Sequence, residues 1–225
     1  MEAKAALLHH LKTFNALIDL MIGLQIDCRT GFKHNKSVME KAQVRAHALA
    51  KLRKDNKPPP TIEEMDRAQA FFARTAPTVP DARYLHRTTQ GEFKSRNSEN
   101  GVNTILMDRS IIVTMYSFWE EHFRPTIAAA ANLTKDEIKL DIFGDLRILR
   151  HCIIHRIGKC DVEIKKTKIL KWFSERDEII LTEQMMDEIF TEVKKGITLL
   201  AKELAGEDVV YHYERPLQPA SSVRS

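Results

Sequence analysis

Apolar residues recur every three or four positions through most of this chain, which is the spacing of amphipathic helices. The spacing predicts a first helix over residues 3–27 and a second over residues 37–55, with Gly31 ending the first of them. The buried side of the first helix is expected to carry Leu7, Leu8, Leu11, Phe14, Leu17, Ile18, Met21, Ile22 and Gln25.

Turn-forming residues interrupt the pattern after the second helix. Three prolines at positions 58–60 stop that helix, because proline has no amide hydrogen to donate. Thr61 and Glu64 have the spacing of a capping box and predict a short helix that reaches about Arg74. Residues 75–104, with their Pro, Gly and Asn, are expected to form a long loop.

Helical spacing returns more strongly in the second half. A helix is predicted over residues 104–131, and Pro125 is expected to kink it. Its buried stripe is expected to contain Ile105, Ile111, Ile112, Met115, Trp119, His122 and Phe123. Thr134 with Glu137 is expected to cap the next helix, which ends at Gly158. The buried face of that helix is expected to carry Ile138, Ile142, Leu146, Leu149 and Ile153.

The pattern closes with a predicted helix over residues 165–174, an extended segment over 178–181, and a final helix from Thr182 to about Leu204 that Gly206 stops. The final helix is expected to bury Met185, Ile189, Val193 and Leu200. Short connections between these late helices predict antiparallel neighbours. The fold class is therefore all-α.

Three regions are expected along the chain. Residues 1–100 are interpreted as an N-terminal helical extension and loop that pack on the core. Residues 101–206 form the core helical domain, and residues 207–225 form a disordered tail.

Composition narrows the class of protein. Hydrophobic residues make up 43% of the chain, and no stretch reaches the roughly 20 apolar residues of a membrane span, so a soluble protein is expected. Three cysteines without a CxxC pair favour reduced thiols in the cytoplasm. The net charge of +4 decides nothing about nucleic acid. Without a P-loop, GxGxxG or GxSxG motif, most nucleotide-hydrolysing and serine-hydrolase functions are excluded.

The chain's main candidate chemistry lies in Arg150 and His155. Arginine can hold a phosphate and histidine can move a proton near neutral pH, which is the minimum needed to cut RNA without a metal. Five positions on an ideal helix rotate by about 140° and rise about 7.5 Å, so the two side chains do not share a face. They converge only if the helix ends near His155 or if a second copy supplies the missing group. Alternatively, both are surface cations that suit the end of a helix.

Other polar residues surround this pair. His151 and His155 have the four-residue spacing of a metal pair, but no third ligand lies at a suitable offset, so no metal is expected and His151 is interpreted as polar support. Tyr116 and Glu120 are four apart on one edge of a helix. Glu120 lies beside the buried stripe and needs a cation, for which Arg150 or His155 is a candidate.

Cations gather in two segments, at 29–57 and 147–171. The second segment surrounds the candidate pair, and Arg147, Arg156 and Lys159 could form a rim that attracts RNA. Both segments could equally be solvated helix faces.

With these residues identified, the second half resembles a prokaryotic HEPN domain over roughly residues 100–205. Residues 115–120 are similar to the family's aromatic-Trp-Glu helix. Residues 145–155 fit its motif of Arg, a polar residue, three variable residues and His, and residues 177–182 resemble the extended segment before its closing helix. The position after the arginine is most often Asn in the family, and here it is His151.

The resemblance implies an antiparallel helical bundle that dimerises and brings two Arg/His motifs into one cleft. It implies a metal-independent RNA endonuclease of a toxin–antitoxin or antiviral system, without cofactor and with a possible antitoxin partner. Arg150 would contact the scissile phosphate and His155 would act as general acid or base. A dimer would also resolve the mismatch of faces within one helix.

Two other functions stay open. The first is a non-catalytic helical module of the same fold that binds a nucleotide, RNA or a protein partner. The second is a nucleic-acid-binding regulator that uses the basic segment 29–57, in which Lys51, Arg53 and Lys54 would carry steeply salt-dependent binding.

Overall fold

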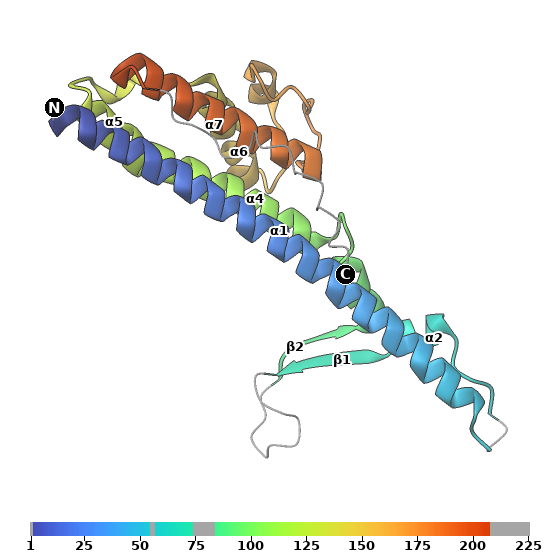
Figure 1. Ribbon diagram of the computed structural model, residues 1–225. Coiled ribbons are helices and arrows are strands. Elements are labelled where there is room, and N and C mark those ends of the chain that lie inside the picture. The colour runs from blue at the N-terminus through green and yellow to red at the C-terminus, as the bar shows by residue number, and fades with distance from the viewer. Residues whose placement is uncertain (1, 55–56, 74–83, 208–225) are drawn as a thin grey trace, which may run out of the picture. The chain divides into compact units, whose positions relative to one another are not determined.

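The computed structural model describes residues 2–54, 57–73 and 84–207, and these are mostly helical (Figure 1), so the all-α prediction is confirmed. The chain divides into two compact units. One takes the residues up to Ile22, Ile112–Ile179 and those from Glu183 onward; the other comprises Gly23–Ile111 and Ile180–Thr182. This division differs from the expected boundary at residue 100. The expected disordered tail lies outside the described residues, apart from Glu207.

The elements run in chain order as α1 (Glu2–Lys51), α2 (Ile62–Arg67), β1 (Gln69–Ala73), β2 (Tyr84–Thr89), α3 (Gln90–Arg96), α4 (Val102–Phe118), η1 (Trp119–Phe123), α5 (Arg124–Ala130), η2 (Lys135–Glu137), α6 (Asp141–His155), η3 (Val162–Lys166) and α7 (Glu183–Ala205). No helix among the described residues is both long and apolar enough to cross a membrane.

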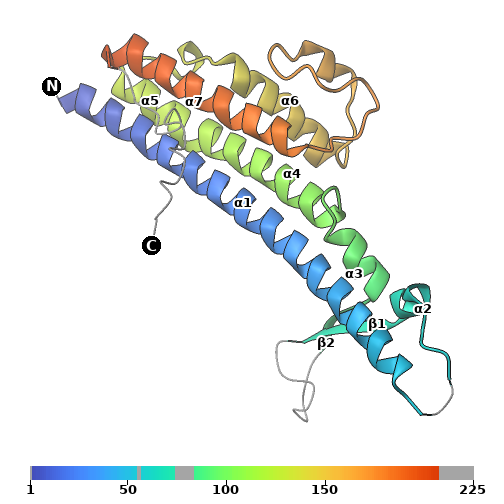
Figure 2. The same cartoon turned by 45° about the vertical axis from the view of Figure 1, so that its right-hand side comes forward.

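The first unit is built around an aromatic cluster. The ring of Phe14, on the start of α1, lies 4.5 Å from Phe123 and 5.8 Å from Trp119. Trp119 stacks on Phe143 of α6 at 4.1 Å between ring centroids, and all four rings are buried. α7 lies beside the N-terminal part of α1 (Figure 2), where Lys194 pairs with Asp19. Packing of these rings holds together α1, η1 and α6, and α6 carries most of the candidate site.

The predicted helix over residues 104–131 is in fact three elements. α4 ends at Phe118, and η1 is a π-helical turn in which the Arg124 N–H bonds to the Trp119 carbonyl. Pro125 follows in the first turn of α5 and cannot donate the amide hydrogen that a continuous α-helix needs. The wider turn changes the direction in which the side chains of η1 point. His122 is therefore exposed and not buried as predicted.

α6 carries the candidate motif; it begins later than predicted and ends where predicted. The capping box of Thr134 and Glu137 is present, but it caps the short η2, and α6 begins only at Asp141. At the other end α6 stops at His155, and Gly158 has a φ of 83° and donates its N–H to the Cys152 carbonyl at 3.0 Å. Such a left-handed glycine terminates a helix, so the predicted end near Gly158 is confirmed.

The loop after α6 is not the helix that was predicted over residues 165–174. η3 ends at Lys166, and the backbone of residues 168–170 is hydrogen-bonded to the Asp145 carboxylate instead of forming a helix. That buried carboxylate accepts backbone N–H groups from Lys168, Ile169 and Leu170 at 2.7–3.1 Å. The expected extended segment begins at Glu178, which forms a β-bridge with Lys159. Side-chain hydrogen bonding from α6 therefore overrides the local helical pattern.

The closing helix α7 matches its predicted range within about one residue, and Gly206 follows it with a φ of 66°. Ile189, Val193 and Leu200 are buried as expected, whereas Met186 is buried in place of the half-buried Met185.

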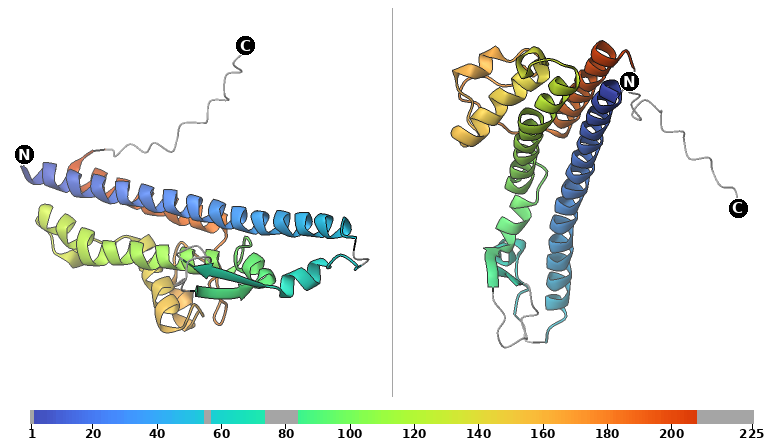
Figure 3. Two further views of the ribbon diagram at one scale, coloured as in Figure 1. Left: turned by 90° about the horizontal axis from the view of Figure 1, so that it is seen from below. Right: turned by 90° about the vertical axis from the view of Figure 1, so that its left-hand side faces the viewer.

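The second unit corrects three further predictions. α1 continues through Gly31 to Lys51, because one interior glycine weakens a helix by only about 1 kcal/mol. α2 has the predicted capping box but ends at Arg67, and β1 begins at Gln69 instead of the helix continuing to Arg74. The expected loop 75–104 contains β2, which pairs antiparallel with β1 (Figure 3), and also α3; residues 74–83 lie outside the described residues.

Buried polar contacts organise this unit. Arg29 donates to Asp108 at 2.6 Å and to the Leu181 carbonyl at 3.2 Å, and it is buried. One of the cations expected on the basic segment 29–57 is therefore interior. Gln43 similarly bonds to Asp66 at 2.7 Å and accepts from Lys94 at 2.9 Å, which ties α1 to α2 and α3.

Candidate functional site

A cavity of about 500 Å³ opens beside the middle of α6 and receives one residue from α4 and one from η3. We call it the Arg150 cavity, and it is lined by Tyr116, Arg147, Ile148, Arg150, His151 and Glu163. Four of the predicted site residues therefore lie around one space. The helix brings three of them together because positions 147, 150 and 151 lie within about one turn of each other.

Arg150 is half-buried in this cavity and carries an unmet hydrogen-bonding group. Its Nε is buried and has no hydrogen-bond partner among the described residues. A guanidinium cannot lose its proton to escape this situation, and leaving such a donor unpaired in a protein interior is unfavourable. The guanidinium carries further N–H donors besides Nε, and two parallel N–H donors of this kind suit a phosphate in the cavity.

Tyr116 lies within electrostatic range of several charges. Burial raises the pKa of its phenol, the Glu120 carboxylate raises it further, and Arg147, Arg124 and Arg150 act in the opposite direction. The phenol therefore stays protonated at neutral pH and can donate its O–H to an anion.

His151 is held by a carboxylate from the loop after α6. Its Nε2 lies 3.3 Å from Oδ2 of Asp161. A hydrogen bond from the Glu163 backbone has the largest effect and lowers the pKa of Asp161; burial opposes it, and His151 and Arg156 lower the pKa further. The acid is therefore ionised at neutral pH and orients the imidazole.

His155 lies at a different place from Arg150. It is exposed, it is the last residue of α6, and it is not among the residues that line the Arg150 cavity. Its nearest described aromatic neighbour is His151, at 5.0 Å between ring centroids. Among the described residues, no third His, Cys, Asp or Glu joins this pair in a group that could hold a metal ion. The prediction that α6 ends near His155 is confirmed, but His155 does not line the cavity that Arg150 lines.

Glu120 has partners other than those expected. Its carboxylate accepts from Arg124 at 2.9 Å and from Lys135 at 2.6 Å. Burial would raise its pKa, but these two hydrogen bonds outweigh burial and lower it. The expectation that Arg150 or His155 would neutralise Glu120 was wrong, because Arg124 at the start of α5 and Lys135 of η2 bind this carboxylate instead.

The three cations expected to contact RNA differ in position. Arg147 is exposed and lines the cavity. Arg156 is exposed and lies 3.6 Å from the Asp161 carboxylate, and Lys159 is exposed in the loop after α6. Only Arg147 is therefore a lining residue.

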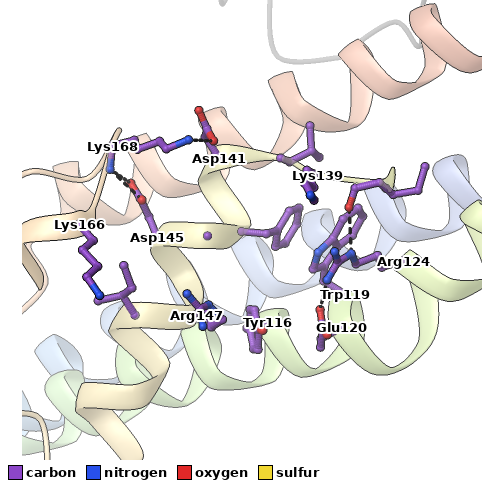
Figure 4. A pocket seen from close by; sticks show the side chains of 15 residues that line it. Tyr116, Trp119, Glu120, Arg124, Lys139, Asp141, Asp145, Arg147, Lys166 and Lys168 are labelled. Carbon is purple, nitrogen blue, oxygen red and sulfur yellow. Dashed lines mark hydrogen bonds and ion pairs between the residues drawn. The ribbon is translucent and has the colours of Figure 1, made fainter. Parts of the chain in front are cut away.

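A second hollow of about 380 Å³ adjoins the first (Figure 4), and we call it the Gly144 groove. It shares Tyr116, Arg147 and Ile148 with the Arg150 cavity. Its other lining residues are Trp119, Glu120, Arg124, Ile138, Lys139, Leu140, Asp141, Phe143, Gly144, Asp145, Lys166 and Lys168. The sequence analysis did not predict this groove. The available signal was that Gly144, Ile148 and His151 have the spacing of one helix face, along which the groove and the Arg150 cavity lie.

The two cysteines near the motif are structural. Burial raises the pKa of Cys152, and burial together with the neighbouring Cys152 thiol raises the pKa of Cys160 to about 12. Both thiols are buried, so neither is a nucleophile at neutral pH.

No protein-family model, curated protein or solved structure matches this chain.

Proposed function

We propose that this chain is a metal-independent RNA endonuclease of the HEPN type, acting as a homodimer in a cytoplasmic toxin–antitoxin or antiviral system. The observation that carries the proposal is Arg150, a half-buried guanidinium that lines an open cavity together with Arg147, Tyr116 and His151. Several donors that converge on one space, without a carboxylate partner for Arg150 among the described residues, favour a phosphate ligand.

The reaction follows from the chemistry of these groups. A ribose 2′-hydroxyl attacks the adjacent phosphorus, and the bond from phosphorus to the 5′-oxygen breaks. His155 of one protomer takes the proton of the 2′-hydroxyl, and His155 of the other gives a proton to the leaving 5′-oxygen. Arg150 stabilises the charge that develops on the phosphate. The products are a 2′,3′-cyclic phosphate and a 5′-hydroxyl.

The remaining site residues have supporting roles in this proposal. The Tyr116 hydroxyl and the Arg147 guanidinium add donors at the phosphate. His151, held by Asp161 at 3.3 Å, supports the end of the helix from which His155 projects. Arg156 and Lys159 lie in the following turn and would contact the RNA backbone away from the cleaved bond.

RNA digestion in EDTA tests the proposal with matched controls. We expect Arg150→Ala and His155→Ala each to abolish cleavage, while His122→Ala and Arg67→Ala, which remove exposed residues of the same types, leave it intact. Full activity of both site variants would refute the catalytic assignment.

A non-catalytic module that binds a nucleotide, RNA or a protein partner is the second candidate. It is favoured by the position of His155 outside the Arg150 cavity, which leaves the anion site of one chain without the imidazole assigned to general acid–base catalysis. This function predicts that RNA binding depends on Arg150 but not on His155, and that purified protein does not cut RNA under any condition in which it is dimeric.

A further inference from the structure

We infer that the Gly144 groove is the subsite for the nucleotide that flanks the cleaved phosphate. This inference rests on the proposed ribonuclease function and adds a specific binding site to it. The groove shares three lining residues with the Arg150 cavity, so a ribose–phosphate chain held by Arg150 can continue directly into it. The volume of about 380 Å³ is in the range of small-ligand sites.

The first argument is the glycine itself. Gly144 lies inside α6, where glycine is less favourable than alanine. A Cβ at this position would meet no atom within 4 Å, so no neighbouring side chain requires the glycine. Gly196 on α7 is different, since a Cβ there would meet the Leu140 side chain at 3.0 Å. Gly144 lines the groove, so a side chain there would extend into it, and its absence leaves the helix backbone open to close approach by a ligand.

The second argument is charge. Five Lys or Arg residues and three Asp or Glu residues line the groove, and the carboxylates are all engaged. Glu120 bonds to Arg124, Asp141 to Lys168, and Asp145 to backbone N–H groups (Figure 4).

Two cations at the groove are left for a ligand. Lys139 and Arg147 are exposed and have no ion pair among the described residues. They supply the positive charge that a second phosphate requires.

The third argument is the floor. The indole of Trp119 and the ring of Phe143 are buried beneath the groove, and Tyr116 is half-buried at the point where the groove meets the Arg150 cavity. Of these three rings, Tyr116 is the one that a base can contact, and an apolar floor with cations at its edge suits a nucleobase and its phosphate.

Binding of an RNA that cannot be cut tests this site separately from catalysis. The probe is a short fluorescent 2′-O-methyl oligoribonucleotide, whose methyl groups remove the attacking hydroxyl, and affinity is measured by anisotropy. Gly144→Leu fills the groove with a good helix former. Gly31→Leu is the matched control, because Gly31 is also an exposed helical glycine with no atom within 4 Å of an added Cβ. Thermal unfolding of each variant shows that it is folded.

We expect Gly144→Leu to weaken probe binding about fivefold or more, since fivefold is the lower end of what a base–aromatic contact contributes to affinity. Gly31→Leu should bind like the wild type. Lys139→Gln is a second variant that does not touch the helix interior, and it should weaken binding and reduce the slope of log K against log salt by about one.

Three results would overturn the subsite: no binding of the probe by the wild type, unchanged binding by folded Gly144→Leu, or equal losses in Gly144→Leu and Gly31→Leu. If Gly144→Leu does not fold, an unchanged salt slope in Lys139→Gln overturns it. Loss of the ribonuclease proposal has a different signature, because it would appear as intact RNA in the cleavage assay whatever the probe affinity.

Discussion

His151 and Asp161 are joined across the turn that ends α6, with Nε2 of the imidazole 3.3 Å from Oδ2 of the carboxylate. The same carboxylate accepts the backbone N–H of Glu163 at 3.0 Å and lies 3.6 Å from Nε of Arg156. One acid therefore connects the helix that carries the candidate motif to the start of η3. This relationship could be expected neither from the spacing of the motif nor from the charge pattern.

Acid should weaken this connection. The pKa of Asp161 is held below its ordinary value in the folded chain, chiefly by the Glu163 backbone. Its contribution to stability is therefore complete above the unfolded-state pKa of about 4 and is lost as the pH falls through the lower folded-state value. Urea unfolding between about pH 6 and pH 3 should show a smaller pH-dependent loss of stability in Asp161→Asn than in the wild type. An identical pH dependence in both proteins would contradict this role.

Alanine at position 144 should make the protein more stable. Gly144 lies inside α6 with open space around an added Cβ, so Gly144→Ala should raise the free energy of unfolding by about 0.5–1 kcal/mol. Gly206→Ala should do the opposite, because Gly206 has a φ of 66°, which alanine adopts with strain. Denaturant titration measures both changes. A destabilised Gly144→Ala would mean that the helix requires glycine there for its own structure.

Asp145 should be among the most sensitive positions in the first unit. Its buried carboxylate accepts N–H groups of Lys168, Ile169 and Leu170, and Asp145→Ala would leave those donors without their acceptor. We expect a loss of about 1.5–3 kcal/mol, the range for hydrogen bonds to a charged group, because the N–H of Leu170 is buried while those of Lys168 and Ile169 are part-buried. Hydrogen exchange should show faster exchange at these three amides. Asp136→Ala, at a largely exposed carboxylate, is the control and should change little.

The thiols should differ in reactivity. Cys152 and Cys160 are buried and their pKa values are raised, whereas Cys28 is half-buried. A neutral maleimide at pH 7 should therefore label Cys28 first in the native protein and all three cysteines only after unfolding. Mass spectrometry of partially labelled protein identifies the site. Rapid labelling of Cys152 in the native state would contradict the packing of α6 described above.

The sequence predicted helices correctly where an apolar stripe is buried by the rest of the fold, as in α7. It predicted helix ends correctly where a nearby residue terminates the helix, as Gly158 does after α6. Boundaries failed where distant contacts decide the structure. The helix predicted over 165–174 is overridden by the Asp145 carboxylate, which lies more than twenty positions earlier. The strand Gln69–Ala73 was read as helix because a short apolar segment fits either structure until its pairing partner is known.

The candidate site was likewise predictable only where its residues are close in sequence. Arg147, Arg150 and His151 share the Arg150 cavity because they lie within about one turn of one helix, and the sequence contains that information. The partners of Glu120 and His151 depend on how η2 and the loop after α6 fold back, and no local pattern encodes them. The sequence does not indicate a role for Gly144, because the open space beside this glycine is visible only in the folded structure.

The most direct measurement is to map the ends of RNA digested in EDTA by the wild type and by the Arg150→Ala/His155→Ala double variant. The account predicts 2′,3′-cyclic phosphate and 5′-hydroxyl ends with the wild type and intact RNA with the folded double variant. Equal cleavage by both proteins, or no cleavage by the dimeric wild type, would contradict it.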